Sequence, residues 1–122
     1  MKKLTLTIGI PAHNEEANIG NLLHSILKQE QKSFVIKKIL VVCDGCTDFT
    51  AFEAKKIGID HPEIVVLNDR KRKGKATRLN KIYQLADTDI VATFDADIAL
   101  ESNWEIEEMV KTFVVNKNVQ VV

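Results

Sequence analysis

The sequence predicts an α/β protein built on a mainly parallel sheet, with helices covering both faces of that sheet. Short, nearly continuous apolar runs alternate along the chain with segments in which apolar residues recur at helical spacing. Turn-forming residues separate these segments, so that strand and helix alternate strictly. Apolar strands joined by helices are typical of parallel sheets buried on both faces, with right-handed crossovers.

The first strand is predicted over residues 4–10, where apolar residues alternate with threonine and glycine, and Pro11 is expected to end it. Asn14 is expected to cap the first helix, because asparagine is favoured at the N-cap. Glu15 and Glu16 would then lie in the first turn, where the helix dipole favours acidic residues. The apolar face of this helix consists of Ile19, Leu22, Leu23, Ile26 and Leu27.

The second strand is predicted over residues 34–43, and Asp44 with Gly45 supplies the turn signal that follows it. Thr47 or Asp48 is expected to cap the next helix, since both residue types are favoured at N-caps. A strand, a turn and a capped helix in this order form one unit of the predicted fold.

The second helix is expected to end at Gly58, and residues 64–67 are expected to form a short third strand. A third helix begins near Lys75. One face of that helix is expected to hold Ala76, Leu79, Ile82, Tyr83 and Ala86.

The fourth strand is predicted in the apolar run of residues 90–94. Ser102 and Glu105 have the spacing of a capping box, which indicates a fourth helix. The apolar face of this helix holds Ile106, Met109, Val110 and Phe113. Residues 118–122 are expected to begin a fifth strand, and because the chain stops there, we expect it to be truncated.

Polar segments follow all four predicted strands. They are residues 11–15, Asp44 with Gly45, residues 70–75 and residues 95–97. In a parallel sheet the carboxyl ends of the strands meet at one edge, and ligands bind outside that edge. The sequence therefore predicts one binding site at the carboxyl edge of the sheet.

Asp95 and Asp97 are candidate ligands for a metal ion. Side chains two residues apart on a strand share a face, so both carboxylates are expected to face one pocket. Like charges at short range repel unless a cation lies between them. Oxygen ligands suit Mg²⁺ or Mn²⁺, which complete their coordination with substrate phosphates. The alternative is a pair of solvated aspartates in a turn.

Residues 70–75, here called the cationic loop, hold five lysines and arginines among six residues. Together with a divalent ion, these cations are suited to a diphosphate, because both offset the charge of a diphosphate leaving group. Asp44 is placed to accept hydrogen bonds from a base or a ribose. The structural alternatives are a solvated basic loop, a simple turn at Asp44, and a helix cap at Asn14 and Glu15.

The composition excludes several other classes of protein. The 122 residues suffice for one small domain, and 17 Lys and Arg balance 17 Asp and Glu. The cationic loop lacks the nearby aromatic residues that stack on nucleic-acid bases, so we expect no nucleic-acid partner. Neither a dinucleotide-binding glycine motif nor a phosphate-binding P-loop follows the first strand.

No apolar run approaches the roughly 20 residues that span a bilayer, and the N-terminus lacks the apolar region of a signal peptide. We therefore expect a cytoplasmic protein, with membrane association only through sequence outside this chain. Cys43 and Cys46 have the spacing of a redox or zinc motif, but the histidines are scattered. Cys43 is better interpreted as the buried end of a strand.

These segments together resemble the inverting glycosyltransferases of the large family 2 type, which have a GT-A fold. The matching segments are IPAHNEE at residues 10–16, DGCTD at 44–48, KGKA at 73–76 with Leu79 and Asn80, and DAD at 95–97. They stand in the family's order at the predicted strand ends. The resemblance implies that residues 1–122 form the nucleotide-sugar-binding part of such an enzyme, without its acceptor-binding part.

The resemblance also implies a role for each matching residue. The nucleoside pocket would be lined by Pro11, Ala12, His13 and Glu15. Asp44 would hydrogen-bond the base, typically uracil, and Lys73 and Lys75 would lie near the base or the diphosphate. Asp95 would approach the ribose, and Asp97, with Asp95 beside it, would hold the Mg²⁺ or Mn²⁺ that bridges the diphosphate. The implied reaction transfers a sugar from a nucleotide sugar, with UDP favoured, and inverts the anomeric carbon.

The chain departs from the family pattern in two respects. Cys46 stands where the family usually has serine, a change that we expect to be tolerated. The family's general base, an aspartate, belongs to sequence beyond Val122, so we expect no turnover by this chain alone. The family also places a later strand beside the fourth strand. Without it the fourth strand would be an exposed edge, and we expect a dimer through that edge.

Two other functions are left open by the sequence. One is a non-catalytic module that binds a nucleotide or nucleotide sugar, which an acidic catalytic motif further along the protein would argue against. The other is a sugar-phosphate nucleotidyltransferase, a class with a similar sheet. That class has a glycine-rich loop bearing arginine after the first strand, whereas this chain has Pro-Ala-His-Asn at residues 11–14.

Overall fold

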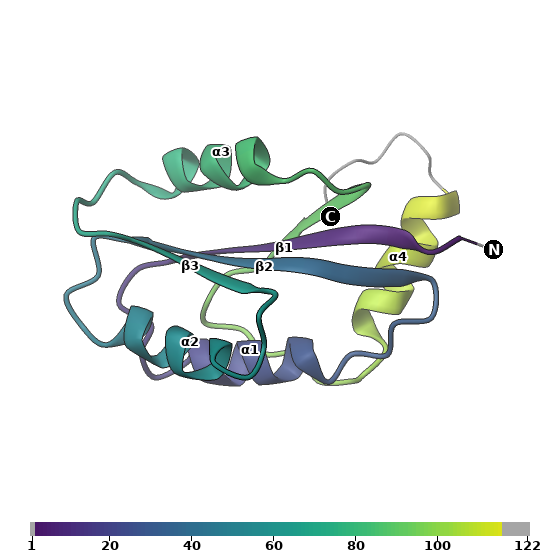
Figure 1. Ribbon diagram of the computed structural model, residues 1–122, viewed down its shortest axis with the longest axis horizontal. Helices are drawn as coiled ribbons and strands as arrows, with labels where there is room; N and C mark the ends of the chain where they lie inside the picture. The colour runs from purple at the N-terminus through teal and green to yellow at the C-terminus, as the bar shows by residue number, and fades with distance from the viewer. Residues whose placement is uncertain (1, 116–122) are drawn as a thin grey trace.

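A computed structural model describes residues 2–115 and confirms the predicted fold class (Figure 1). The elements are β1 (Leu4–Ala12), α1 (Ile19–Leu27), β2 (Phe34–Asp44), α2 (Thr50–Gly58), β3 (Ile64–Asp69), α3 (Lys75–Leu85), β4 (Ile90–Thr93) and α4 (Glu105–Val115). Within the described residues the strands form one sheet in the order β3-β2-β1-β4, and every neighbouring pair is parallel. The carboxyl ends of the strands therefore lie at a common edge.

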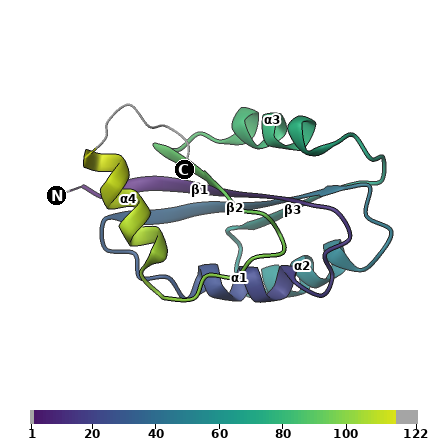
Figure 2. The same cartoon turned by 180° about the vertical axis from the view of Figure 1, so that it is seen from behind.

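Helices cover both faces of the sheet (Figures 1 and 2). α3 lies on one face, where Ile82 packs against Leu40 and Val42 of β2. α1 and α2 lie on the other face, where they pack on a larger core to which α4 also contributes. Gly9 of β1 permits the close approach of α3, because a Cβ there would overlap the side chain of Ile82. None of the helices described is long and apolar enough to cross a membrane.

The first strand continues through Pro11 to Ala12, so the prediction that Pro11 ends it was wrong. Proline lacks an N–H and is tolerated where no neighbouring strand needs that donor. The carbonyl of Gly9 faces β4 and accepts the N–H of Phe94 at 3.0 Å. Pro11 lies two residues after Gly9, so its backbone nitrogen faces the β4 side as well. The last β1–β4 pair is Gly9 with Thr93, so no residue of β4 lies opposite Pro11 to need an N–H donor.

Asn14 does not cap α1, contrary to the prediction. It adopts a left-handed conformation with φ of 51°, and its side-chain oxygen accepts the N–H of Thr47 at 2.8 Å. α1 begins at Ile19 with Asn18 in the N-cap position, so Glu15 lies outside the first turn. Asn14 therefore connects the loop before α1 to the loop before α2.

The start of α2 agrees only in part with the predicted cap. Phe49 occupies the N-cap position, while the carboxylate of Asp48 accepts the N–H of Thr50 at 3.0 Å. Asp48, the residue before the N-cap, thus accepts one of the N–H groups that the first turn of α2 leaves without a partner in the helix. The helix ends at Gly58, as predicted.

The apolar face predicted for α3 is confirmed in part, because Ile82 is fully buried and Leu79 packs against the same core. The buried residues of α3 are Arg78 and Ile82, whereas Tyr83 is 40% exposed and Ala76 is also exposed. Arg78 and Ile82 are four residues apart and therefore lie on one helical face. Tyr83 follows Ile82 directly and so points about 100° away around the helix axis.

α4 begins at Glu105, two residues later than a capping box with Ser102 as the N-cap requires. The Ser102 hydroxyl accepts the N–H of Trp104 at 3.1 Å instead of that of Glu105. Gln29, two residues after the end of α1, caps α4 in its place, because its side-chain oxygen accepts the N–H of Ile106 at 3.0 Å. The strand predicted at residues 118–122 lies outside the described residues.

β4 lies at one edge of the described sheet and pairs only with β1 there. The dimer expected through this edge stays a prediction.

Gly45 makes the turn after β2 possible. Its φ is +61°, a conformation that L-residues with a side chain rarely adopt. A Cβ on Gly45 would lie only 2.8 Å from the main-chain nitrogen of Arg72. The absence of a side chain therefore lets the cationic loop approach the end of β2.

Glu107 is a buried carboxylate that connects α4 to the loop before β2. It is 1% exposed and accepts the N–H groups of Lys32 and Ser33 at 3.1 and 2.9 Å, as well as the Ser33 hydroxyl. Burial raises the pKa of Glu107, but these hydrogen bonds outweigh burial and hold the pKa below its ordinary value of 4.5. The carboxylate is therefore ionised and fully engaged at neutral pH.

We expect Glu107→Ala to lower the free energy of unfolding by about 1–3 kcal/mol, because the N–H groups of Lys32 and Ser33 lose their buried acceptor. Urea unfolding measures this change. Glu108→Ala, at an exposed position on the same helix, is the control and should stay within about 0.5 kcal/mol of the unchanged protein. Because the folded pKa is the lower one, the stabilisation is present above pH 4.5 and is lost as the pH falls through the folded pKa. Equal losses in both variants would contradict the role of Glu107.

We expect Gly45→Ala to lower the free energy of unfolding by at least about 1–2 kcal/mol, the usual cost of a left-handed L-residue. Contact with the backbone of Arg72 adds to this cost. Gly20→Ala is the control, since Gly20 lies within α1 and its nearest neighbour to a new Cβ is 3.8 Å away. That change should stabilise by up to about 1 kcal/mol. In thermal unfolding, Gly45→Ala should lower the midpoint and Gly20→Ala should raise it. Equal changes in the two midpoints would contradict the close approach of Arg72 to Gly45.

Candidate functional site

A cavity of about 360 Å³, here called the rim cavity, lies at the carboxyl ends of β1, β2 and β4. Its lining residues are Pro11, Ala12, His13, Glu15, Asp44, Arg72, Lys75, Arg78, Asp95, Ala96 and Asp97. The structure thus brings together every predicted site residue except Lys73. The sequence reasoning missed Arg78 and included Arg72 only as a member of the cationic loop.

Asp95 and Asp97 both line the rim cavity, although the predicted geometry was wrong in one respect. β4 ends at Thr93, so the two carboxylates stand in the loop after the strand and not on one face of it. Both side chains are exposed, and Asp95 accepts a hydrogen bond from the Lys75 ammonium at 2.6 Å. Asp95, and more weakly the charge of Asp97, raise the pKa of Lys75. An acidic pair and one ammonium group therefore share the mouth of the cavity.

The acidic pair suits an ion that a substrate helps to bind. The described residues contain no group of three or more His, Cys, Asp or Glu side chains able to hold a metal by themselves. Mg²⁺ usually takes one or two protein carboxylates and completes its shell with water and substrate phosphates. Asp95 and Asp97 supply that donor set from an exposed position, so the residues present fit such an ion.

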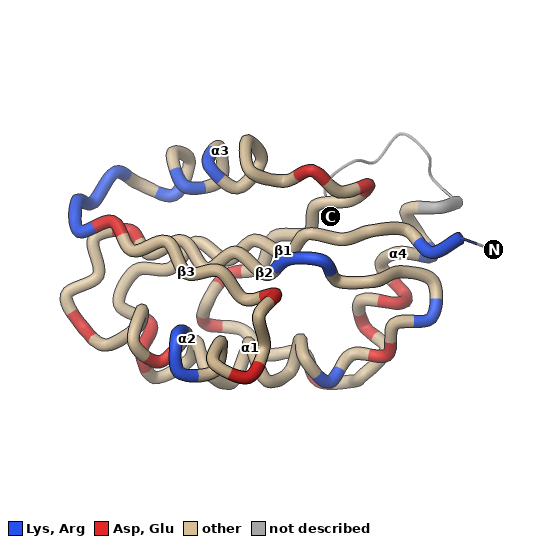
Figure 3. The backbone as a smooth tube through the Cα atoms, in the orientation of Figure 1, with Lys and Arg blue, Asp and Glu red and all other residues tan. Residues whose placement is uncertain are grey.

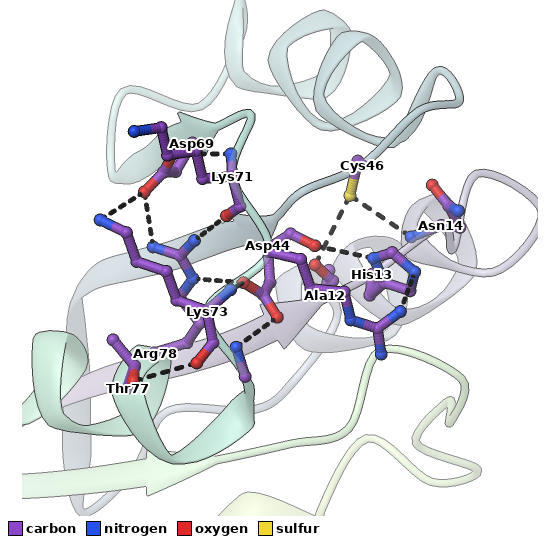
Figure 4. A network of polar contacts seen from close by, with 12 residues as sticks. Ala12, His13, Asn14, Asp44, Cys46, Asp69, Lys71, Lys73, Thr77 and Arg78 are labelled. Atoms are coloured by element: carbon purple, nitrogen blue, oxygen red, sulfur yellow. Dashed lines mark hydrogen bonds and ion pairs between the residues drawn. The ribbon is translucent and has the colours of Figure 1, made fainter.

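His13 is held between the end of β2 and the cationic loop. Its Nδ1 lies 2.7 Å from the main-chain oxygen of Asp44, which is only an acceptor, so Nδ1 carries the hydrogen (Figure 4). Its Nε2 lies 2.5 Å from Nη1 of Arg72, which is only a donor. The two contacts fix the tautomer of the neutral ring and its orientation at the cavity wall.

Asp44 forms the back of the rim cavity and is 5% exposed. Its carboxylate accepts the N–H groups of Lys73 and Gly74 at 2.6 and 3.0 Å, and Nε of Arg78 at 2.8 Å. Burial raises the pKa of Asp44, but these hydrogen bonds outweigh burial and lower it. Asp44 therefore stays ionised and binds the cationic loop. The hydrogen bond predicted between Asp44 and a base stays a prediction.

Arg78 joins Asp44 to Asp69 at the ends of neighbouring strands (Figure 4). Nη1 donates to Asp69 at 3.0 Å, and Nη2 donates to the carbonyl of Lys71 at 2.6 Å. The N–H of Lys71, with Arg78 and Lys73, holds the pKa of Asp69 far below its ordinary value. The signal that could have found Arg78 is its position four residues before Ile82, on the buried face of α3.

Lys73 turns away from the rim cavity. Its ammonium group lies 3.2 Å from Asp69 and lines a second cavity, of about 750 Å³, between α3 and β3. Arg78 lines both cavities and so separates them. Figure 3 shows the lysines and arginines of the cationic loop gathered at the carboxyl edge of the sheet.

The two cysteines differ in their surroundings. Cys43 is fully buried, as predicted, and burial raises its pKa to about 12. Cys46 is half-buried, and its Sγ accepts the N–H of Asn14 at 3.3 Å and donates to the carbonyl of Ala12 at 3.5 Å (Figure 4). A serine hydroxyl can both donate and accept in the same way, which explains why cysteine is compatible with this position.

A curated relative supports a link to sugar transfer. The chain is 36% identical over 108 residues to the 4,4'-diaponeurosporenoate glycosyltransferase of Staphylococcus aureus strain USA300. The match covers 88% of this chain and 28% of the relative. The chain therefore spans less than a third of that relative's length.

Solved structures share the fold. The mannosyltransferase PcManGT from Pyrobaculum calidifontis, in complex with GDP-Man and Mn²⁺, matches with a TM-score of 0.82 and 25% identity, over 93% of this chain and 33% of that one. Staphylococcus aureus TarS in complex with UDP-GlcNAc matches with a TM-score of 0.77 and 20% identity, over 93% of this chain and 32% of that one. The second likeness shows the fold alone.

The family model is decisive, because it covers nearly the whole chain. The model described as glycosyl transferase family 2 matches residues 7–122. It includes all four strands' carboxyl ends and every residue that lines the rim cavity. The chain therefore belongs to glycosyl transferase family 2.

Proposed function

We propose that the rim cavity binds a nucleotide-sugar donor, and that the protein to which this chain belongs transfers the sugar to an acceptor hydroxyl with inversion. The observation that carries the proposal is the convergence of Asp95, Asp97 and Lys75 with the His13 and Asp44 segments around one cavity. Carboxylates for a cation and ammonium groups for phosphate are the two features that a nucleoside diphosphate requires.

The proposal assigns the inner wall to the nucleoside and the mouth to the diphosphate. Pro11, Ala12 and His13 would contact the nucleoside, with Asp44 behind them. Lys75 would contact the diphosphate, because its ammonium group already faces the acidic pair. With the nucleoside at the inner wall and the diphosphate at the mouth, the sugar would lie beyond the diphosphate, at the open side of the cavity.

A divalent ion, Mg²⁺ or Mn²⁺, would be held by Asp97 with Asp95. When bound, the ion offsets the negative charge that develops on the diphosphate leaving group. The Mn²⁺ in the PcManGT complex supports a divalent ion in a related protein. The residues of this chain contribute the carboxylates, and Lys75 contributes a fixed positive charge on the same side.

The proposed donor carries a uracil base, and the proposed acceptor site lies outside this chain. The related structures hold GDP-Man in one case and UDP-GlcNAc in the other, and we favour UDP from the sequence resemblance. We also propose that the general base for the acceptor hydroxyl comes from sequence not present in this chain. The relatives are about three times longer, which leaves room for an acceptor site.

We expect UDP to bind in a calorimetric titration with Mn²⁺ present, and Asp97→Asn to raise the Kd at least about tenfold, or 1.4 kcal/mol. The loss follows because the substitution removes a metal ligand. Asp87→Asn is the control, since it makes the same change of charge at the exposed start of the loop before β4, at the opposite edge of the sheet.

Three results of this titration would be informative. Binding that is equally tight without Mn²⁺ would contradict the metal site. GDP binding more tightly than UDP would contradict the choice of base. Failure of both nucleotides to bind the folded protein would contradict the donor site itself.

We expect Lys75→Met to weaken the binding of UDP about tenfold while leaving the weaker binding of uridine unchanged. The reason is that the ammonium group acts on the diphosphate, which uridine lacks. Lys71→Met is the control, because it removes a charge from the same loop at a residue that does not line the rim cavity. Equal weakening of UDP and uridine would show that Lys75 shapes the pocket and does not act on phosphate.

A further inference from the structure

Arg78 is a buried cation, and each of its three side-chain nitrogens donates a hydrogen bond to the protein. Its side chain is 6% exposed, and its three nitrogens donate to Asp44, Asp69 and the carbonyl of Lys71. A buried charge is costly unless it is paired and hydrogen-bonded, and here two carboxylates pair with it. The guanidinium group therefore has a fixed position, although it lines the rim cavity.

The two carboxylates need this cation. Asp44 and Asp69 are directly opposite each other in the parallel pairing of β2 and β3, so two negative charges meet at one edge. Like charges placed opposite each other on neighbouring strands are destabilising. The guanidinium of Arg78 bonds to both, and this lets both remain ionised.

Both carboxylates, in turn, hold the cationic loop. Asp44 accepts the main-chain N–H groups of Lys73 and Gly74, and Asp69 accepts that of Lys71 at 2.9 Å. Arg78 itself takes the carbonyl of Lys71. The loop is therefore anchored through its backbone, which leaves the side chain of Arg72 to reach His13.

We propose that Arg78 is a positioning residue for the donor site, one that sets the place of the cationic loop without touching the donor. The inference rests on the proposed function. Through the loop, Arg78 fixes where Arg72 meets His13 and where α3 begins at Lys75, whose ammonium group faces Asp95. The donor is a nucleoside diphosphate sugar, and the groups placed in this way are its contacts at the cavity wall and mouth.

Asp69 gives the sharpest test, because it does not line the rim cavity. A change there reaches the donor only through Arg78 and the loop. We expect Asp69→Asn and Arg78→Met each to raise the Kd for UDP with Mn²⁺ about tenfold, and Arg78→Lys to fall in between. Lys81→Met is the matched control, since it removes the same charge from an exposed position on the same helix.

Amide hydrogen exchange, measured without any nucleotide, tests the loop directly. The N–H groups of Lys73 and Gly74 should exchange at least about tenfold faster in Arg78→Met and Asp69→Asn than in Lys81→Met. If Arg78→Met does not fold, Asp69→Asn and Arg78→Lys give the same two readouts.

Two outcomes would overturn the inference. One is a folded Asp69→Asn or Arg78→Lys protein that binds UDP as tightly as the unchanged protein, even if its unfolding midpoint is lower. The other is unchanged exchange at Lys73 and Gly74. Failure of the unchanged protein to bind UDP is a different result, because it contradicts the proposed function and does not alter the exchange measurement.

Discussion

Asp44 and Asp69 end two neighbouring parallel strands and face each other across the sheet edge, where two ionised carboxylates repel. The guanidinium of Arg78 bonds to both and removes that repulsion. The position of the cationic loop follows from this contact. With the carboxylates ionised, five hydrogen-bonded groups of the cationic loop and α3 gain fixed acceptors, and the loop lies against Gly45. A six-residue basic segment that would repel itself is thereby ordered.

The parallel sheet explains why so much of the site was predictable. Strand periodicity locates each strand's carboxyl end, and a parallel sheet brings those ends to one edge, so residues far apart in sequence were expected to meet. His13, Asp44 and Lys75 do line one cavity. Asp95 and Asp97 reach the same cavity for a different reason from the one predicted, because β4 ends before them. The prediction depended on the parallel direction of the strands more than on local strand geometry.

The residues that were missed or misplaced depend on partners distant in sequence. Arg78 meets Asp44, 34 positions earlier. Its spacing from Ile82 places it on the buried face of α3, but no local pattern identifies the carboxylates that pair with it. Asn14 has the composition of an N-cap, but its side chain binds Thr47, 33 positions later. Pro11 continues a strand because β4 is too short to need its N–H. Local propensity gives way in each case to a tertiary contact.

The charges at the rim fall into two groups with different physical roles. Asp44 and Arg78 are buried, paired with each other and hydrogen-bonded to further protein groups, so breaking their contact removes a charged partner from each in a low-dielectric region. Lys75 and Asp95 form an exposed pair, and water replaces each partner readily when the pair separates. If the proposed function holds, a cation and a diphosphate arriving at the mouth would exchange the Lys75–Asp95 contact for new ones, while the Asp44–Arg78 contact stays in place. The buried pair would then provide a rigid wall, and the exposed pair would provide the groups that change partner when the proposed donor binds.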